Sequence, residues 1–165
     1  MRHTKCNFTP KLPAVQLTFS KYNFTIKTDD TQQLIFDVIR RKYVSLTPEE
    51  WVRQHIIHYL LYDHHFPKAL ISVEKQVVVN TLSKRTDIVL YNTSASPKLI
   101  VECKAPEVKI TQKTFEQIAR YNLSLQVPYL WVTNGATHFL CSIDHQKHNF
   151  TFLENLPSPA IITAV

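Results

Sequence analysis

Hydrophobic residues recur along the chain with two periods, every second position in short runs and every three to four positions in longer ones. The first period predicts strands and the second predicts helices. The most distinctive runs are 87–91 and 99–104, which are rich in aliphatic side chains and joined by a polar link of Asn, Thr, Ser and Pro. This composition predicts a β-hairpin. Because strand side chains alternate between faces, we expect Glu102 and Lys104 on one face and the neighbouring apolar residues on the other.

The turn of this hairpin decides which residues face each other. If it is centred between Ser94 and Ala95, Asp87 lies opposite Glu102, and opposed side chains of an antiparallel pair have Cβ atoms about 4.5–5.5 Å apart. Two carboxylates at that distance repel each other unless a cation lies between them. Mg²⁺ prefers hard oxygen ligands and retains several waters, so this pair would suit it. Lys104 would then orient or help to deprotonate a water, or neutralise charge on a phosphate.

The first helix has a clear start signal. Thr47 is expected as its N-cap and Pro48 as its first residue, and Glu50 stands three residues after the cap, as a capping box requires. The helix should end near Asp63. Acidic residues are ordinary in a first turn because they favour the helix dipole, so this segment alone does not assign a metal to Glu49 or Glu50.

A second helix is predicted over residues 115–125 with Thr114 as its cap. Gln117 and Tyr121 are four residues apart, so they stand on one face of it. Four further strands are predicted, over residues 70–80, 129–133, 137–143 and 150–153, with a turn at Asn134-Gly135 between the second and third of them. Strands and helices in this order predict an α/β fold, with a mixed central β-sheet flanked by helices.

The length of 165 residues indicates one domain. Residues 1–33 are expected to be a lead-in, with residues 16–19 and 22–27 forming a short hairpin. The folded domain is predicted over residues 34–156, and residues 157–165 are expected to be an extended tail.

Composition points to an anionic partner. Nineteen Lys and Arg residues against thirteen Asp and Glu residues give a net charge of +6, which favours nucleic acid first. The cysteines Cys6, Cys103 and Cys141 form neither a disulfide framework nor a zinc pattern, so free thiols in a cytoplasmic protein are expected. No apolar run is long enough to span a membrane, so no membrane partner is expected.

Two other polar groups of the sequence are interpreted as surface features. The basic run 40–42 is expected to be a solvated edge, with phosphate contact as the alternative. The histidines lack a Cys or acidic partner that would complete a zinc set, so we expect polar surface groups at His55, His58, His64, His65, His138, His145 and His148.

Four segments in this order resemble a known family: 47–54, 85–89, 101–106 and 117–121. The layout of helix, Asp…Glu-x-Lys, helix and strand resembles the PD-(D/E)XK nuclease superfamily. More closely, the chain is similar to the N-terminal nuclease domain of type I restriction enzyme R subunits, and Gln-x-x-x-Tyr is typical of the RecB-like branch. The resemblance implies a restriction-endonuclease-like fold and a Mg²⁺-dependent DNA endonuclease, in which Mn²⁺ substitutes for Mg²⁺.

The resemblance also implies roles for individual residues. Asp87 and Glu102 would be metal ligands and Lys104 the catalytic lysine. An acidic residue of the first helix would join the metal, with Glu49 the better fit and Glu50 the alternate.

Further roles concern the DNA. Gln117 and Tyr121 would position it or support the site, and the charge of Lys84 and Arg85 beside the site suggests contacts with phosphates. Thr86 stands where the superfamily name has a proline, which is no ligand. The chain has one glycine, so it cannot contain the phosphate loop Gly-x-x-x-x-Gly-Lys of a helicase motor. We therefore expect a stand-alone relative or one domain of a larger polypeptide, with DNA, a helicase or translocase, or other restriction-modification subunits as partners.

Two alternatives remain open at this stage. A non-catalytic DNA-binding or docking module would retain the nuclease fold without its chemistry. A basic α/β domain whose charges are only solvated would also show an Asp at one strand end and a Glu-x-Lys pair at another. The opposed carboxylates favour the nuclease, because a purely structural protein has no reason to keep them.

Overall fold

The structure is a computed structural model that describes residues 16–29, 31–79, 82–123 and 125–165. Strand β8 (Pro97–Cys103) lies inside its main sheet. It pairs antiparallel with β7 (Ile88–Tyr91) and parallel with β9 (Tyr129–Thr133). The other strands of the sheet are β4 (Ile71–Val73), β10 (His138–Asp144) and β11 (Asn149–Phe152). The strand order is β11-β10-β9-β8-β7-β4. The sheet therefore contains both pairing directions, which confirms the predicted mixed α/β architecture.

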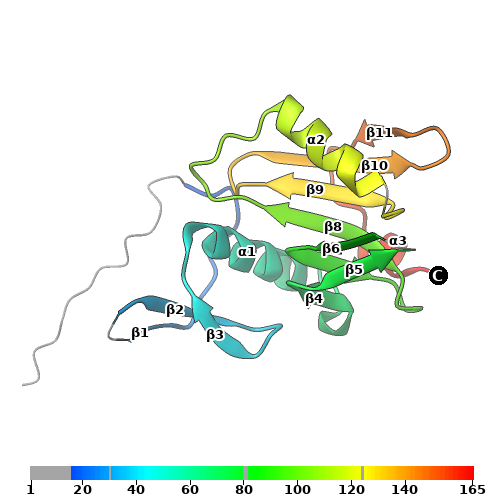
Figure 1. Cartoon of the computed structure of the whole chain (residues 1–165). Coiled ribbons are helices and arrows are strands. Elements are labelled where there is room, and N and C mark those ends of the chain that lie inside the picture. The colour runs from blue at the N-terminus through cyan, green and yellow to red at the C-terminus, as the bar shows by residue number, and fades with distance from the viewer. Residues whose placement is uncertain (1–15, 30, 80–81, 124) are drawn as a thin grey trace, which may run out of the picture.

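Helices α1 (Pro48–His58) and α2 (Gln112–Leu123) cover opposite faces of this sheet (Figure 1). The alternation of β8 divides its side chains between them: Leu99 and Val101 pack with α1, and Ile100 packs with the α2 residues. Burial on both faces explains why β8 is a nearly continuous apolar run. Helix α2 lies in the crossover that a parallel β8–β9 pair requires.

A separate antiparallel sheet contains β1 (Ile26–Thr28), β2 (Gln33–Asp37) and β3 (Lys42–Ser45). The predicted hairpin of residues 16–19 with 22–27 is therefore wrong, since β1 pairs with β2 instead. This sheet also extends across the predicted boundary between residues 33 and 34. The rest of the predicted lead-in, residues 1–15, lies outside the described residues.

The histidines of α1 are buried, although the sequence analysis expected surface groups. His55 is 7% and His58 4% exposed. Phe24, from the N-terminal segment, covers them with ring centroids 4.7 and 4.5 Å away, and burial lowers the pKa of both imidazoles. Each Nδ1–H donates to a carbonyl one turn earlier, to Trp51 at 2.8 Å and to Gln54 at 2.9 Å. The aromatic residues that alternate with polar ones in residues 22–27 therefore pack against α1.

Helix α1 begins as predicted. The Thr47 hydroxyl accepts a hydrogen bond of 3.1 Å from the Glu50 N–H, and Pro48 occupies the first turn. A π-helical turn, η1 (Tyr59–Asp63), continues α1 to the predicted end, and a short 3₁₀ helix, η2 (Lys68–Leu70), follows. The acidic side chain of Glu50 does not complete a capping box, because it enters an ionic cluster described below.

The strand predicted over residues 70–80 is divided in two. After β4 the backbone of Glu74 takes a positive φ of 50°, and its N–H donates to the Asp87 carbonyl at 2.9 Å. The chain then forms β5 (Gln76–Val79), which pairs with β6 (Leu82–Arg85) as a two-stranded ribbon. This bend brings Glu74 beside the residue that precedes β7.

The C-terminal half differs from the predictions at two helices. Thr111 rather than Thr114 caps α2, since its hydroxyl accepts from the Thr114 N–H at 3.2 Å. The tail expected to be extended contains the short helix α3 (Pro159–Thr163), whose Ile162 is fully buried. The hydrophobic side chain of Ile162 explains the difference, because it packs into the core beneath α1.

The turn at Asn134-Gly135 joins β9 to β10, as predicted. Gly135 has φ +86°, a conformation that favours glycine, and a Cβ there would lie 2.6 Å from the Leu17 side chain. The Asn134 side chain accepts from the N–H groups of Ala136 and Thr137 at 3.0 and 2.7 Å. The turn also contacts the N-terminal segment, because the Thr18 N–H donates a hydrogen bond of 2.9 Å to the Gly135 carbonyl.

Cys103 and Cys141 are buried free thiols, as predicted, and Cys6 lies outside the described residues. Burial raises the pKa of the Cys141 thiol to about 12, so it is protonated at neutral pH. Among the described helices, none has the length and apolar character needed to cross a membrane.

Candidate active site

Asp87 and Glu102 lie across the β7–β8 pair. Ile88 pairs with Val101, so the next position outward brings Asp87 opposite Glu102, which is the predicted register. Asp87 precedes β7 and its Oδ2 accepts a hydrogen bond of 2.7 Å from the Cys103 N–H. Glu102 is 9% exposed, and strand alternation places it on the face of β8 that is turned to α2.

Lys104 follows β8 directly. Its N–H donates to the Thr133 carbonyl at 2.8 Å, so the backbone continues beside β9 for one more residue. If the alternation of β8 continues for this residue, Lys104 lies on the same face as Glu102, which stays a prediction, and the residue is half-buried.

Arg53 connects Asp87 to α1. Its Nη2 donates to Asp87 Oδ1 at 2.8 Å, and its Nη1 donates to Glu50 Oε2. The Arg53 side chain is only 6% exposed. Burial alone would lower the pKa of its guanidinium, but the carboxylates of Asp87 and Glu50 outweigh that effect, and the pKa is raised above its ordinary value. Arg53 is therefore charged at any pH at which the protein folds.

A second arginine, Arg40, extends these contacts. Three carboxylates surround it at 2.6 Å each: Asp37 at Nε, Glu50 at Nη2 and Glu74 at Nη1. Arg40 is thus largely buried, and its assignment to a solvated edge is corrected. We call Asp37, Arg40, Glu50, Arg53, Glu74 and Asp87 the ionic cluster. Its four carboxylates outnumber its two guanidinium groups, which leaves a formal charge of −2.

The two acidic residues of the first helical turn differ sharply. The Glu50 side chain is 6% exposed, and its Oε1 accepts from Arg40 at 2.6 Å and from the Gln54 amide at 2.9 Å. The Glu49 side chain is 44% exposed, with a contact of 3.4 Å to Arg53 Nη2. Glu50 is therefore committed to the ionic cluster, whereas Glu49 has its carboxylate largely exposed, and both residues line a hollow of about 540 Å³ together with Arg40, Lys42 and Tyr43.

The donor set suits a divalent ion held by few protein ligands. Among the described residues, no three His, Cys, Asp or Glu side chains come together as a ligand set. The predicted third ligand, Glu49 or Glu50, therefore stays a prediction. Two opposed carboxylates with water and phosphate oxygens in the remaining positions are the arrangement that Mg²⁺ prefers.

The residues predicted to meet DNA belong to two elements, β6 and α2. Gln117 is exposed on α2, in a hollow shared with Lys113, Glu116 and Arg120. The Arg85 side chain is 73% exposed and pairs with Glu74 at 3.1 Å. The side chains of Lys84 and Tyr121 lie outside the described part of the chain.

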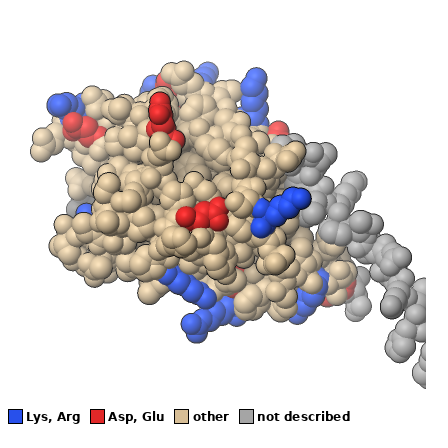
Figure 2. All heavy atoms as spheres, turned by 180° about the vertical axis from the view of Figure 1, so that it is seen from behind, with Lys and Arg blue, Asp and Glu red and all other residues tan. Residues whose placement is uncertain are grey.

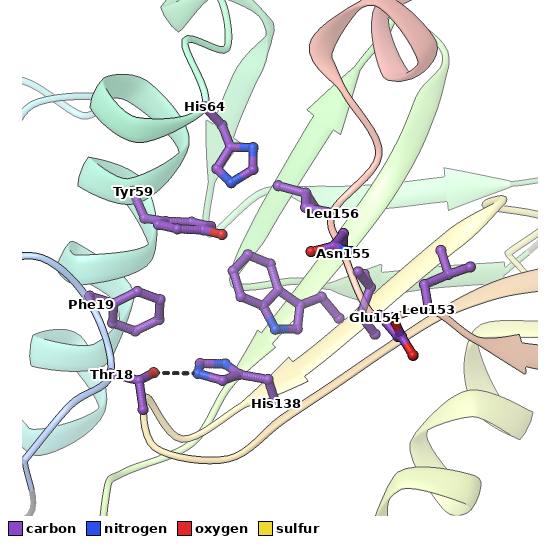
Figure 3. A pocket seen from close by; sticks show the side chains of 11 residues that line it. Thr18, Phe19, Tyr59, His64, His138, Leu153, Glu154, Asn155 and Leu156 are labelled. Carbon is purple, nitrogen blue, oxygen red and sulfur yellow. Dashed lines mark hydrogen bonds between the residues drawn. The ribbon is translucent and has the colours of Figure 1, made fainter.

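Among the described residues, the surface of Figure 2 and the cavity of Figure 3 show no second pair of carboxylates. On the face seen in Figure 2, most of the surface is uncharged and the charged residues are scattered. A cavity of about 330 Å³ is lined by aromatic rings, among them Phe19 and Tyr59, and Thr18 Oγ1 lies 2.6 Å from His138 Nε2 at its edge (Figure 3). Glu154 is the single carboxylate among its lining residues, so it has no carboxylate pair.

Three residues of the ionic cluster were not predicted as part of the site: Arg53, Arg40 and Glu74. The spacing of Glu49 and Glu50 to Arg53, four and three residues on one helix, was the available signal for the first of them. Nothing in the local pattern indicates that Arg40 also contacts Glu50 and Glu74, which lie 10 and 34 residues away.

Comparisons with known proteins agree with the fold. A family model described as type I restriction enzyme R protein N terminus matches residues 48–157, two-thirds of the chain. The structure is similar to a fragment described as an HsdR subunit of a type I restriction enzyme from Vibrio vulnificus YJ016, with a TM-score of 0.50 and 19% identity. That match covers 71% of this chain but 24% of the Vibrio chain, and it supports the predicted restriction-endonuclease-like fold. No curated protein matches the chain.

Proposed function

Because the chain belongs to the family of type I restriction enzyme R protein N termini, we propose that it is a Mg²⁺-dependent DNA endonuclease domain. The observation that carries the proposal is the placement of Asp87 opposite Glu102, with Lys104 predicted on the same face of the strand. A carboxylate pair beside a lysine is what phosphodiester hydrolysis at a metal site requires.

Each residue has a definite part in the proposed reaction. Asp87 and Glu102 would hold the Mg²⁺ ion. Mn²⁺ could take its place at the same two carboxylates. When bound, the ion would polarise the scissile phosphate and lower the pKa of a bound water. Lys104 would orient that water or neutralise charge that develops on the phosphate. Of the two helix carboxylates, we propose Glu49 as the one that would join Asp87 and Glu102 in holding the ion, because Glu50 is committed to Arg40, Arg53 and Gln54.

DNA would be the substrate, and its phosphates would meet positive side chains around the site. Arg85 and Lys84 lie on the ribbon that leads into Asp87, and Arg85 is exposed. Gln117 would contact the backbone from α2 and Tyr121 would support it. The chain spans about a quarter of the Vibrio protein it resembles, so a helicase or translocase and other restriction-modification subunits are proposed as partners.

Cleavage of plasmid DNA with Mn²⁺ or Mg²⁺ tests the proposal. Asp87→Asn and Glu102→Gln should each abolish the metal-dependent cleavage, since each neutralises one proposed ligand. Glu107→Gln, a change at an exposed carboxylate, serves as the control and should cleave like the wild type. Full activity in either ligand variant would refute the proposed site.

A non-catalytic DNA-binding or docking module is the second candidate. It is favoured by one observation: both oxygens of Asp87 accept hydrogen bonds from the protein, from Arg53 and from the Cys103 N–H. DNA binding with no cleavage by the wild type, also in the presence of its motor subunit, would establish this second function.

A further inference from the structure

Arg53 joins two carboxylates that belong to different elements. Its two terminal nitrogens point to separate acceptors, Nη1 to Glu50 on its own helix and Nη2 to Asp87 at the start of β7. Residues 53 and 87 are 34 positions apart, so the contact fixes α1 against the hairpin. A guanidinium presents its donors in a rigid planar fork, and therefore the position of one carboxylate constrains the other.

Both oxygens of Asp87 are consequently fixed. Arg53 holds Oδ1 at 2.8 Å and the Cys103 N–H holds Oδ2 at 2.7 Å. Each carboxylate oxygen has a second lone pair, so both bonds leave acceptor capacity on the carboxylate. The side chain is thereby set in one orientation before any ion arrives.

The guanidinium of Arg53 is in turn held by Glu50. Glu50 accepts from Arg53 through Oε2 and from Arg40 and Gln54 through Oε1. Arg40 in turn contacts Asp37 and Glu74. Because the cluster keeps its excess of negative charge, the guanidinium beside Asp87 does not make the surroundings repulsive to a cation.

We propose that Arg53 is a positioning residue that presents Asp87 to the metal ion. This inference rests on the proposed function, since it assumes that Asp87 is a ligand. Groups that hydrogen-bond a ligand from behind orient it and tune its affinity, and their loss typically weakens metal binding by about 10–100-fold. Lysine at this position would keep the charge but could not reach Glu50 and Asp87 together in the geometry of a fork.

The test compares Arg53→Lys with Arg41→Lys in Mn²⁺ titrations of the protein without DNA. Both changes replace an arginine by a lysine, but Arg53 is buried and contacts Asp87, whereas Arg41 is exposed. We expect the Mn²⁺ dissociation constant of Arg53→Lys to rise at least tenfold and that of Arg41→Lys to stay close to the wild-type value. In cleavage assays, Arg53→Lys should need more Mn²⁺ and regain most of its rate at saturation.

Other outcomes separate this inference from the function on which it rests. Equal Mn²⁺ affinities in Arg53→Lys and the wild type would overturn the positioning role and leave the endonuclease proposal intact. If Asp87→Asn binds Mn²⁺ with the same dissociation constant as the wild type, both the positioning role of Arg53 and the proposed metal site would be overturned. If Arg53→Lys does not fold, the double variant Glu50→Gln, Arg53→Gln removes both buried charges together, and weakened Mn²⁺ binding is again expected.

Discussion

The main-chain N–H of Cys103 donates a 2.7 Å hydrogen bond to the side chain of Asp87, which ties the residue before β7 to the last residue of β8. The outermost Cα pair of the two strands is Ile88 with Val101, so the bond joins the residue before Ile88 to the second residue after Val101. Asp87 thus extends the hairpin with its side chain instead of its backbone. Its carboxylate is held by this bond and by Arg53, at the position where it is proposed to bind the ion.

This relationship predicts a thermal response to metal. A ligand that binds only the native state raises the unfolding temperature, so Mn²⁺ or Mg²⁺ should stabilise the wild type. Asp87→Asn should lose most of this stabilisation, because the amide is a weaker ligand than the carboxylate. Differential scanning fluorimetry with and without the ion measures this shift of the unfolding temperature. Glu107→Gln is the matched control, and an equal shift in Asp87→Asn would place the ion elsewhere.

The second prediction concerns phosphate contacts on the β5–β6 ribbon. DNA binding by the wild type should weaken steeply with salt, the logarithm of the binding constant falling by about 0.9 per phosphate contact for each tenfold rise in salt. Changing Lys84 and Arg85 to Gln should reduce that slope by about two such units if both meet phosphates. Fluorescence anisotropy at several salt concentrations measures the slope.

The control for this experiment is Lys147→Gln, which removes one exposed positive charge at the β10–β11 turn. Its slope should match that of the wild type. Loss of affinity in the double variant with no change in slope would argue against phosphate contacts.

The buried histidines predict acid sensitivity. Burial lowers the pKa of His55 and His58 below the value of 6.5 that an exposed imidazole has. The unfolded chain therefore binds protons that the folded chain does not, and the free energy of unfolding should fall as the pH drops below about 6.5. Urea unfolding at pH 7.5 and 5.5 measures the difference.

His55→Phe should flatten this dependence, because it removes one titrating group and keeps an aromatic ring beside Phe24 and Trp51. His148→Gln, at an exposed position, is the control and should retain the wild-type profile. An unchanged pH profile in His55→Phe would show that His55 does not cause the sensitivity.

The part of the site that the sequence predicts is local. Asp87 and Glu102 stand on two strands joined by a short polar link, so the period of two and the turn position are enough to set the register. Thr47 and Pro48 likewise report the start of α1 without any knowledge of the fold. These signals depend only on neighbours within a few residues.

The remainder depends on contacts between distant segments. Arg40 meets Glu74 from 34 residues away, and their pairing converts a basic run into the interior of an ionic cluster. His55 and His58 are buried because Phe24 packs on them, which the amphipathic pattern of α1 does not reveal. Ile162 is buried because α3 folds back onto the core. Periodicity carries no information on such tertiary partners, so these features could not be predicted.

The last prediction tests whether α2 serves the site or only the fold. Gln117 is exposed, whereas Phe115 and Ala119 on the same helix are buried against the sheet. Gln117→Ala should therefore change the free energy of unfolding by less than about 0.5 kcal/mol, the usual range for surface positions. If the amide contacts DNA, the same change should lower DNA affinity or the cleavage rate. Gln146→Ala, at an exposed turn, is the matched control.

Two measurements on the same samples decide this case. Chemical unfolding gives the stability of Gln117→Ala, and anisotropy with a labelled duplex gives its affinity. Reduced affinity at wild-type stability would support a DNA contact by α2, since Gln146→Ala removes an equal side chain without effect. Normal affinity and cleavage in Gln117→Ala would contradict it. In that case the positive neighbours Lys113 and Arg120, which share the hollow with Gln117, would be only solvated charges, and α2 would act solely as the crossover between β8 and β9.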